Sequence, residues 1–211
     1  NSHDEIRNYF GSSMQFSNKK IIMLEEYVTK VGPQIGGDAY YSKNKVQFIA
    51  FGAQHNYKND PFLPNGMTFP YSLSLEIHKK IIFLLEKVLK SLNIEDLIFN
   101  FEIMVDKNNK IYLMELGARA GGNFIHKAIQ YKYGIDLVKT ELTRKLSHTP
   151  KNKEYPFVSY FLKNKKGTLM PYNLIKEFPT SNKTKVLLMS FSSQEEAQLF
   201  FTEPYVSNEL G

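Results

Sequence analysis

FNFEIMVDKNNKIYLMELGARAGGN, residues 99–123, contains two alternating apolar runs joined by a polar turn. Asparagine tolerates positive φ, so the Asn108–Asn109 pair favours a two-residue hairpin loop between the runs. Counting outward from this tip gives the cross-strand pairs Lys107–Lys110, Val105–Tyr112, Ile103–Met114 and Glu102–Glu115. The stretch therefore predicts an antiparallel hairpin with two glutamates directly opposite each other.

Glu102 and Glu115 give this hairpin a chemical meaning. Residues directly opposite in a hairpin share a face, with Cβ atoms about 5 Å apart. Two like charges at that spacing destabilise a sheet unless a positive charge lies between them. Mg²⁺ prefers carboxylate and phosphate oxygens, so the pair predicts a divalent cation site. The alternative is a surface hairpin whose acidic side chains are solvated.

The glycine-rich segment after Glu115, residues 117–123, leads into a helical pattern. Asn123 is a candidate N-cap of that helix. A helix N-terminus beside an arginine, here Arg119, can receive an anion such as phosphate. Two carboxylates, an arginine and an anion-binding turn within about 20 residues favour a nucleotide triphosphate site.

Composition excludes several function classes. Hydrophobic residues make up 42% and charged residues 23% of the 211, which is ordinary for a globular protein. The chain has no cysteine, which excludes disulfides and thiolate metal sites. No apolar run is long enough to span a bilayer, so we expect a cytoplasmic protein with no membrane partner. The net charge is +6, but the lysines are scattered among turns, which disfavours nucleic-acid binding.

A family resemblance rests on F-N-F-E followed by M-E-L-G-A-R-A-G-G-N. These motifs resemble the metal-binding end of the ATP-grasp fold, in particular its carbamoyl-phosphate-synthase-like and amino-acid-ligase-like members. The resemblance implies that Glu102 and Glu115 bind Mg²⁺ or Mn²⁺ and that Arg119 contacts a phosphate or an acyl phosphate. The sequence departs from the family at Gly117, where many members carry an asparagine as a third metal ligand.

The apolar run Lys20–Leu24 predicts a buried strand. In ATP-grasp proteins a similar strand leads into the adenine hinge, and the resemblance implies that backbone groups of Glu25, Glu26, Tyr27 and Val28 meet the adenine edge. The family continues with Gly-x-Glu, which holds the ribose. This chain has Gly-Pro-Gln instead, so Gln34 is the candidate for a hydrogen bond to a ribose hydroxyl.

The remaining pattern alternates strands and helices. A second hairpin is predicted around Lys43–Asn44, and it ends at Gln54 and His55, which we expect to point toward a triphosphate. Residues 56–72 predict a long loop. A strong amphipathic helix follows, capped by Ser72 or Ser74 and reaching about Asn93, and two further helices flank Gly134. This order predicts an α+β fold with an antiparallel sheet and packed helices.

The character of the sequence changes at residues 149–153, which suggests two units. Residues 1–148 resemble the C-terminal portion of an ATP-grasp domain, and residues 149–211 a small accessory unit containing β-strands. Within the second unit, Leu174 to Phe178 suggests a short helix.

The resemblance implies an ATP- and Mg-dependent ligase that joins a small carboxylate to an amine or a thiol through an acyl phosphate. We expect a fragment that carries the nucleotide and metal site, lacks the N-terminal domain of the same protein and is inactive alone, with homodimerisation left open. One alternative is a non-catalytic nucleotide-binding module, which the residues at Gly117 and Gln34 favour. A basic nucleic-acid-binding domain is the other alternative, and a salt titration would separate it.

Overall fold

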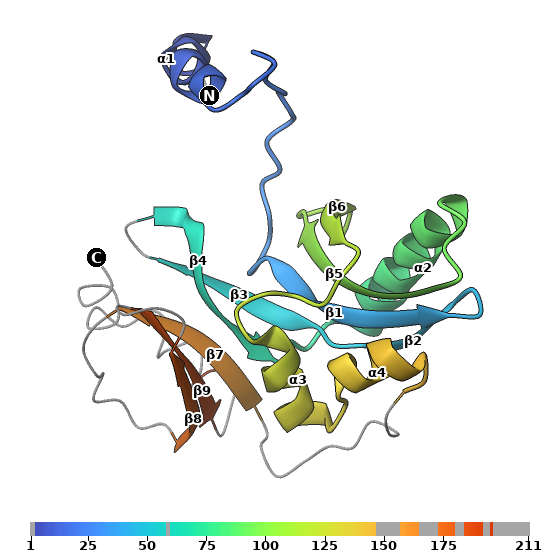
Figure 1. The fold of residues 1–211 in the computed structure, drawn as a ribbon. Coiled ribbons are helices and arrows are strands. Elements are labelled where there is room, and N and C mark those ends of the chain that lie inside the picture. The colour runs from blue at the N-terminus through green and yellow to red at the C-terminus, as the bar shows by residue number, and fades with distance from the viewer. Residues whose placement is uncertain are drawn as a thin grey trace.

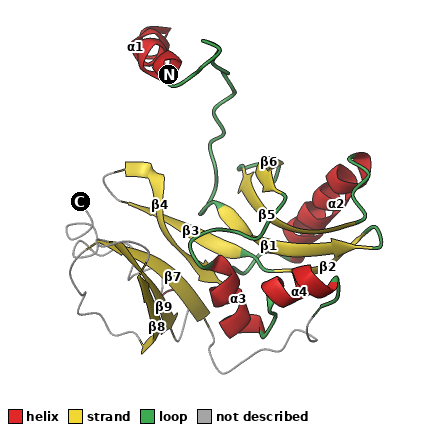
Figure 2. Cartoon of the chain, viewed as in Figure 1, coloured by secondary structure: helices red, strands yellow, loops and turns green. Residues whose placement is uncertain are grey.

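The computed structural model describes residues 3–57, 60–146, 157–164, 173–179 and 184–191, together with residue 195. Its strands form one nine-stranded sheet in the order β6-β5-β1-β3-β4-β7-β9-β8, with β2 paired to β1 (Figure 1). Every pairing between these strands is antiparallel. The predicted α+β class with an antiparallel sheet is confirmed (Figure 2).

The elements follow one another along the chain with short connections. They are α1 (His3–Gln15), β1 (Ile35–Ser42), β2 (Lys45–Ile49), β3 (Gly52–Tyr57), β4 (Asp60–Phe69), α2 (Leu75–Ser91), β5 (Asp96–Val105), β6 (Ile111–Gly117), α3 (Ile125–Tyr133), α4 (Leu137–Thr143), β7 (Phe157–Asn164), β8 (Asn173–Pro179) and β9 (Thr184–Phe191).

Helix α2 covers one face of the sheet. Ser74 caps it by accepting a hydrogen bond from the Ile77 amide, as one of the two predicted caps. Its apolar stripe, which includes Ile81 and Leu85, packs on side chains of β1 and β5 such as Phe99. Alternation along a strand sends every second side chain to this apolar face.

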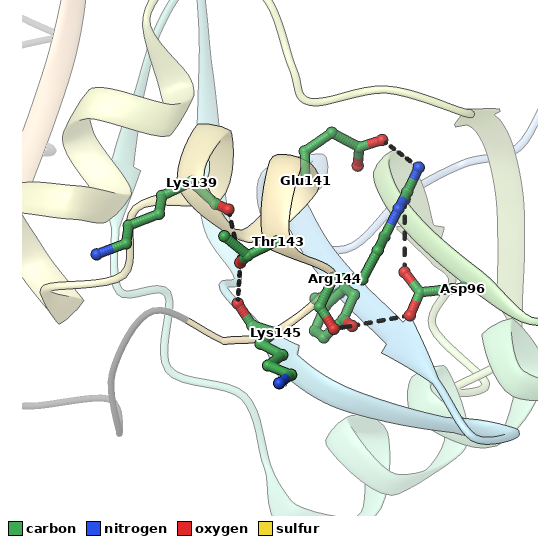
Figure 3. Close-up of polar contacts among 7 residues, drawn as sticks. Asp96, Lys139, Glu141, Thr143, Arg144 and Lys145 are labelled. Atoms are coloured by element: carbon green, nitrogen blue, oxygen red, sulfur yellow. Dashed lines mark hydrogen bonds and ion pairs between the residues drawn. The ribbon is translucent and has the colours of Figure 1, made fainter.

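Helices α3 and α4 pack on the opposite face (Figure 1). They are separated at Gly134, which has φ +74°, so the predicted break there is confirmed. The C-terminus of α4 is fastened to the start of β5 because the Arg144 guanidinium lies 3.4 Å from Asp96 (Figure 3). Glu141 holds the other side of the same guanidinium at 3.0 Å. These two helices cover only part of their face, and the uncovered part carries polar side chains.

Two predictions about β4 and β8 are wrong. Residues 60–69 form strand β4 where a loop over residues 56–72 was predicted. The prolines there were interpreted as loop signals, but Pro64 lies opposite Asn56 next to register shifts, where a missing backbone donor is tolerated. The predicted helix from Leu174 to Phe178 is strand β8, paired along its length with β9.

The predicted strand Lys20–Leu24 is also absent. Residues 21–29 are extended but unpaired, and α1 lies apart from the sheet beyond them (Figure 1). Ile21, Met23 and Leu24 are exposed, with 69%, 79% and 68% of their surface accessible. Apolar composition suggested a strand, but within the described residues ladder contacts begin only at Lys30, which bridges to Asp106.

Strands β7, β9 and β8 extend the sheet from β4, and Val158 and Leu188 belong to the core under α3. The predicted boundary at residues 149–153 lies outside the described residues, so the division into two units stays a prediction. Among the helices of the described chain, none combines the length and the apolar character that crossing a bilayer requires.

Candidate nucleotide and metal site

The hairpin of β5 and β6 turns one residue earlier than predicted. Its loop is residues 107–109, closed by a hydrogen bond from the Asp106 amide to the Lys110 carbonyl. Asn109 has φ +58°, and the Asp106 carboxylate accepts the amides of Asn108 and Lys110. A three-residue loop that ends in a left-handed residue is a common hairpin form. The predicted pairs Lys107–Lys110, Val105–Tyr112 and Ile103–Met114 are therefore wrong.

A bulge in β6 restores the predicted alignment of the two glutamates. Ile103 pairs with Leu113, whereas Glu102 pairs with Glu115, so Met114 is the additional residue. One extra residue reverses the faces of the residues beyond it. The turn and the bulge compensate each other, and the prediction that Glu102 and Glu115 lie opposite on one face is confirmed.

The electrostatics of Glu102 fit a cation site. Burial raises the pKa of this carboxyl group, and the charge of Glu115 raises it further. A hydrogen bond from the Gln34 side-chain amide opposes that rise. No cluster of three or more His, Cys, Asp and Glu side chains occurs in the described part of the chain. A divalent cation held here would have two carboxylates as its protein ligands and would relieve their mutual repulsion.

A cavity of about 490 Å³ opens next to Glu102 on the polar part of the sheet face. This volume lies within the usual range for small-molecule sites. Its lining residues are Tyr27, Val28, Lys30, Gln34, Gln54, Asn56, Pro64, Glu102, Met104 and Met114. The structure thus brings together five of the predicted residues from three separate segments of the chain.

Half of the lining was missed by sequence reasoning. Gln54 and Asn56 follow the two-residue period of β3, as Glu102 and Met104 follow that of β5. Carrying the alternation one step beyond each predicted residue would have found Asn56 and Met104. Lys30 has no such signal, and burial lowers the pKa of its ammonium group. Met114 enters the lining through the bulge, which the sequence does not mark.

Two predicted residues lie in the glycine-rich segment, outside the cavity lining. Arg119 is exposed, and its guanidinium donates a hydrogen bond to the Ala120 carbonyl. Asn123 is exposed with φ +51°, and the N-cap of α3 is Phe124 rather than Asn123. The predicted cap is wrong because residues 122–124 form a turn before the helix begins, which moves its start by one residue.

Three further candidates do not reach the cavity. His55 projects from β3 opposite to Gln54, and its Nε2 lies 2.8 Å from the Thr68 hydroxyl. Burial lowers the pKa of His55 to about 3, so the ring is neutral at physiological pH. Glu25 and Glu26 are exposed on the extended segment before Tyr27. A role for their backbone groups at an adenine edge stays a prediction.

Asp38 is a polar residue beside the site that sequence reasoning did not single out. It is fully buried on β1, on the same face as Glu102, because Gly36 pairs with Glu102 and Asp38 with Asn100. Burial raises the pKa of Asp38 to about 6. Hydrogen bonds from Asn100 and Gly121 and the positive charge of Arg119 oppose the rise. A lone aspartate within an otherwise apolar strand pattern was the available signal.

Several solved structures are similar to this chain. An L-amino acid ligase from Bacillus licheniformis is 19% identical over 84% of this chain and 53% of its own, with a TM-score of 0.65. Phosphoribosylglycinamide synthetase from Anaerococcus prevotii is 17% identical over 100% and 60%, with a TM-score of 0.61. Biotin carboxylase from Campylobacter jejuni, in a complex with β-γ-ATP, is 13% identical over 93% and 50%, with a TM-score of 0.67.

These likenesses establish the fold, and this chain spans between half and three fifths of each of those structures. No protein with a curated description matches the sequence. The model of the ATP-grasp domain matches residues 3–127, which is more than half of the chain and includes the lining residues of the cavity and both glutamates. The chain belongs to the ATP-grasp family.

Proposed function

We propose that this chain carries the nucleotide and metal site of an ATP- and Mg-dependent ligase that joins a carboxylate to an amine or a thiol. The observation that carries the proposal is the cavity itself. It combines apolar walls for a flat base with amides and a carboxylate, and a second carboxylate stands across the strand pair. Family members are mostly ATP-dependent ligases, which supports the reaction class.

The side chains divide the ligand between them. Tyr27 and Val28 offer the apolar surface for adenine, whereas Gln34 and Gln54 offer amides to the ribose and phosphates. Glu102 and Glu115 would hold Mg²⁺, which neutralises phosphate charge when it is bound. Charge on the transferred group would meet the guanidinium of Arg119.

The proposed reaction has two steps. A carboxylate oxygen attacks the γ-phosphorus of ATP, the bond to the β-γ bridging oxygen breaks, and ADP leaves. The amine or thiol then attacks the acyl carbon, loses a proton, and inorganic phosphate departs. The chain's own residues contribute positioning and charge stabilisation in both steps. The small carboxylate and its nucleophile are taken up by surfaces that these residues do not define.

Calorimetric titration with Mg·ATP tests the site. Glu102→Gln and Glu115→Gln each remove one carboxylate, and we expect each to weaken binding about tenfold while the fold remains intact. Glu95→Gln is the matched control, since this exposed glutamate precedes the same strand. Unchanged affinity in both site variants would refute the metal assignment.

A non-catalytic nucleotide-binding module is the second candidate. It is favoured by Gly117, which supplies no ligand, and by the Gln34 amide that occupies one oxygen of Glu102. The two candidates differ in ADP release. Mg-dependent ADP formation that requires an added carboxylic acid would support the ligase, whereas binding without turnover in the chain joined to the rest of its protein would support the module.

A further inference from the structure

Asp38 is the buried charged group that the proposed reaction leaves unused. Its Oδ1 accepts two hydrogen bonds, from the Gly121 amide at 2.8 Å and from the Asn100 side-chain amide at 3.0 Å. The same Asn100 nitrogen lies 2.9 Å from the Gly37 carbonyl. Oδ2 has no hydrogen-bond partner. A buried carboxylate with one unpaired oxygen is unfavourable for stability, so its retention calls for a role.

The hydrogen bonds of Asp38 reach the middle of the glycine-rich segment. A Cβ added at Gly121 would lie 2.7 Å from the Asn100 amide nitrogen and 2.8 Å from Asp38 Oδ1. The backbone of Gly121 therefore rests directly on these two side chains. A Cβ added at the neighbouring Gly122 would meet nothing within 4 Å. Contact with the sheet is thus concentrated at one residue of this pair.

Arg119 lies between this contact and the end of β6. Gly117 is the last residue of β6 and pairs with Asn100, and four residues later Gly121 is held by Asp38. The Arg119 amide bonds back to the Gly117 carbonyl at 2.7 Å. Its positive charge acts on Asp38, so the two groups lie within electrostatic reach. With both ends of a short segment fixed, the position of the residue between them is fixed too.

We infer, on the basis of the nucleotide function proposed above, that Asp38 and Asn100 are positioning residues that hold Gly121 and thereby set Arg119 against the phosphates. Asp38 does not touch the nucleotide in this arrangement. It acts through the backbone of the glycine-rich segment, and the hydrogen bonds to Oδ1 are its means. An asparagine at position 38 keeps a carbonyl acceptor there and preserves the positioning.

Comparing ATP with adenosine separates positioning from general structural support. Both ligands use the adenine side of the cavity, but only ATP has phosphates for Arg119. We expect Arg119→Ala, Asp38→Ala and Gly121→Ala each to weaken ATP binding about tenfold in the presence of Mg²⁺, the size of one lost charge-assisted hydrogen bond. Adenosine affinity, measured by NMR titration, changes less than twofold. Gly122→Ala and Asp38→Asn bind both ligands as the parent does.

A double-mutant cycle gives the decisive result. Because Asp38 works through Arg119, the pair Asp38→Ala with Arg119→Ala binds ATP no more weakly than Arg119→Ala alone. If Asp38→Ala does not fold, Gly121→Ala with Arg119→Ala supplies the same cycle. Additive losses, or equal losses for ATP and adenosine, would overturn the positioning role while the nucleotide function stands. A parent chain that binds no ATP would overturn the nucleotide function, and the positioning role with it.

Discussion

The cavity has two walls that are held in different ways. The sheet wall consists of Gln34, Gln54, Asn56, Pro64, Glu102, Met104 and Met114, and the hinge wall consists of Tyr27, Val28 and Lys30. Gln34 and Gln54 are only 9% and 8% exposed, and their backbones belong to or adjoin the strand ladder. Tyr27 is 67% exposed on a segment outside the ladder.

This difference separates geometry from mobility within one site. Backbone hydrogen bonds and a core beneath fix the groups of the sheet wall, so its carboxylates and amides are preorganised. The hinge wall has few buried contacts, and such segments open at low free energy. Perturbing the sheet wall should thus change stability, whereas perturbing the hinge wall should change only what binds to it.

The largest expected effect comes from the core beneath the sheet wall. Phe101 is fully buried between Glu102 and Asn100 in sequence, and its ring meets Phe51 edge-on at 5.8 Å. We expect Phe101→Ala to lower the free energy of unfolding by about 3–5 kcal/mol in urea denaturation. Phe83→Ala is the matched control, since this ring on α2 is 69% exposed. Comparable losses in the two variants would show that the wall is not supported from below.

A pH dependence is the next largest effect. The pKa of Asp38 is about 6 in the fold, above its ordinary value of 3.8, so the folded state holds this proton more tightly. Stability contributed by the protonated form is full below pH 4 and is lost as pH rises through 6. We expect the parent to lose up to about 3 kcal/mol relative to Asp38→Asn between pH 4 and 7. Parallel pH profiles for the two proteins would contradict the raised pKa.

Sequence alone predicted most of the sheet wall because its cause is local. Alternation of apolar and polar residues fixed the faces of β5 and β6, and Gly134 and Ser74 marked helix ends. The predicted partner of Glu102 was right although the turn was wrong, since the early turn and the bulge at Met114 compensate. A bulge depends on packing against neighbouring strands, so no residue type announces it.

The hinge wall and the glycine-rich segment were predicted less well for the same physical reason. Lys20–Leu24 has the composition of a strand, but a ladder needs partners that composition does not supply. The burial of Asp38 depends on Asn100 and Gly121, which are more than 60 residues away in sequence. Contacts of that range are set by the assembled sheet and cannot be inferred from a local pattern.

A smaller effect is expected at the cation site of the sheet wall. Glu115→Gln removes the charge opposite Glu102, and without divalent cations we expect stability to rise by about 0.2–1 kcal/mol at pH 7. Saturating Mg²⁺ with nucleotide should then stabilise the parent more than the variant, because only the parent offers two carboxylates. Thermal unfolding with and without ligand measures both quantities. A variant less stable than the parent without cations would contradict the repulsion between the pair.

The smallest effect is expected in the segment that leads to the hinge wall. Met23→Ala and Leu24→Ser alter side chains that are 79% and 68% exposed, so we expect unfolding free energies within about 0.5 kcal/mol of the parent. Amide hydrogen exchange gives the same comparison without substitution. Amides of residues 21–29 lack ladder hydrogen bonds within the described chain and should exchange early, whereas those of Phe99 and Phe101 should exchange only on global unfolding. Slow exchange throughout 21–29 would mean that this segment packs as firmly as the sheet wall, and the contrast between the two walls would fail.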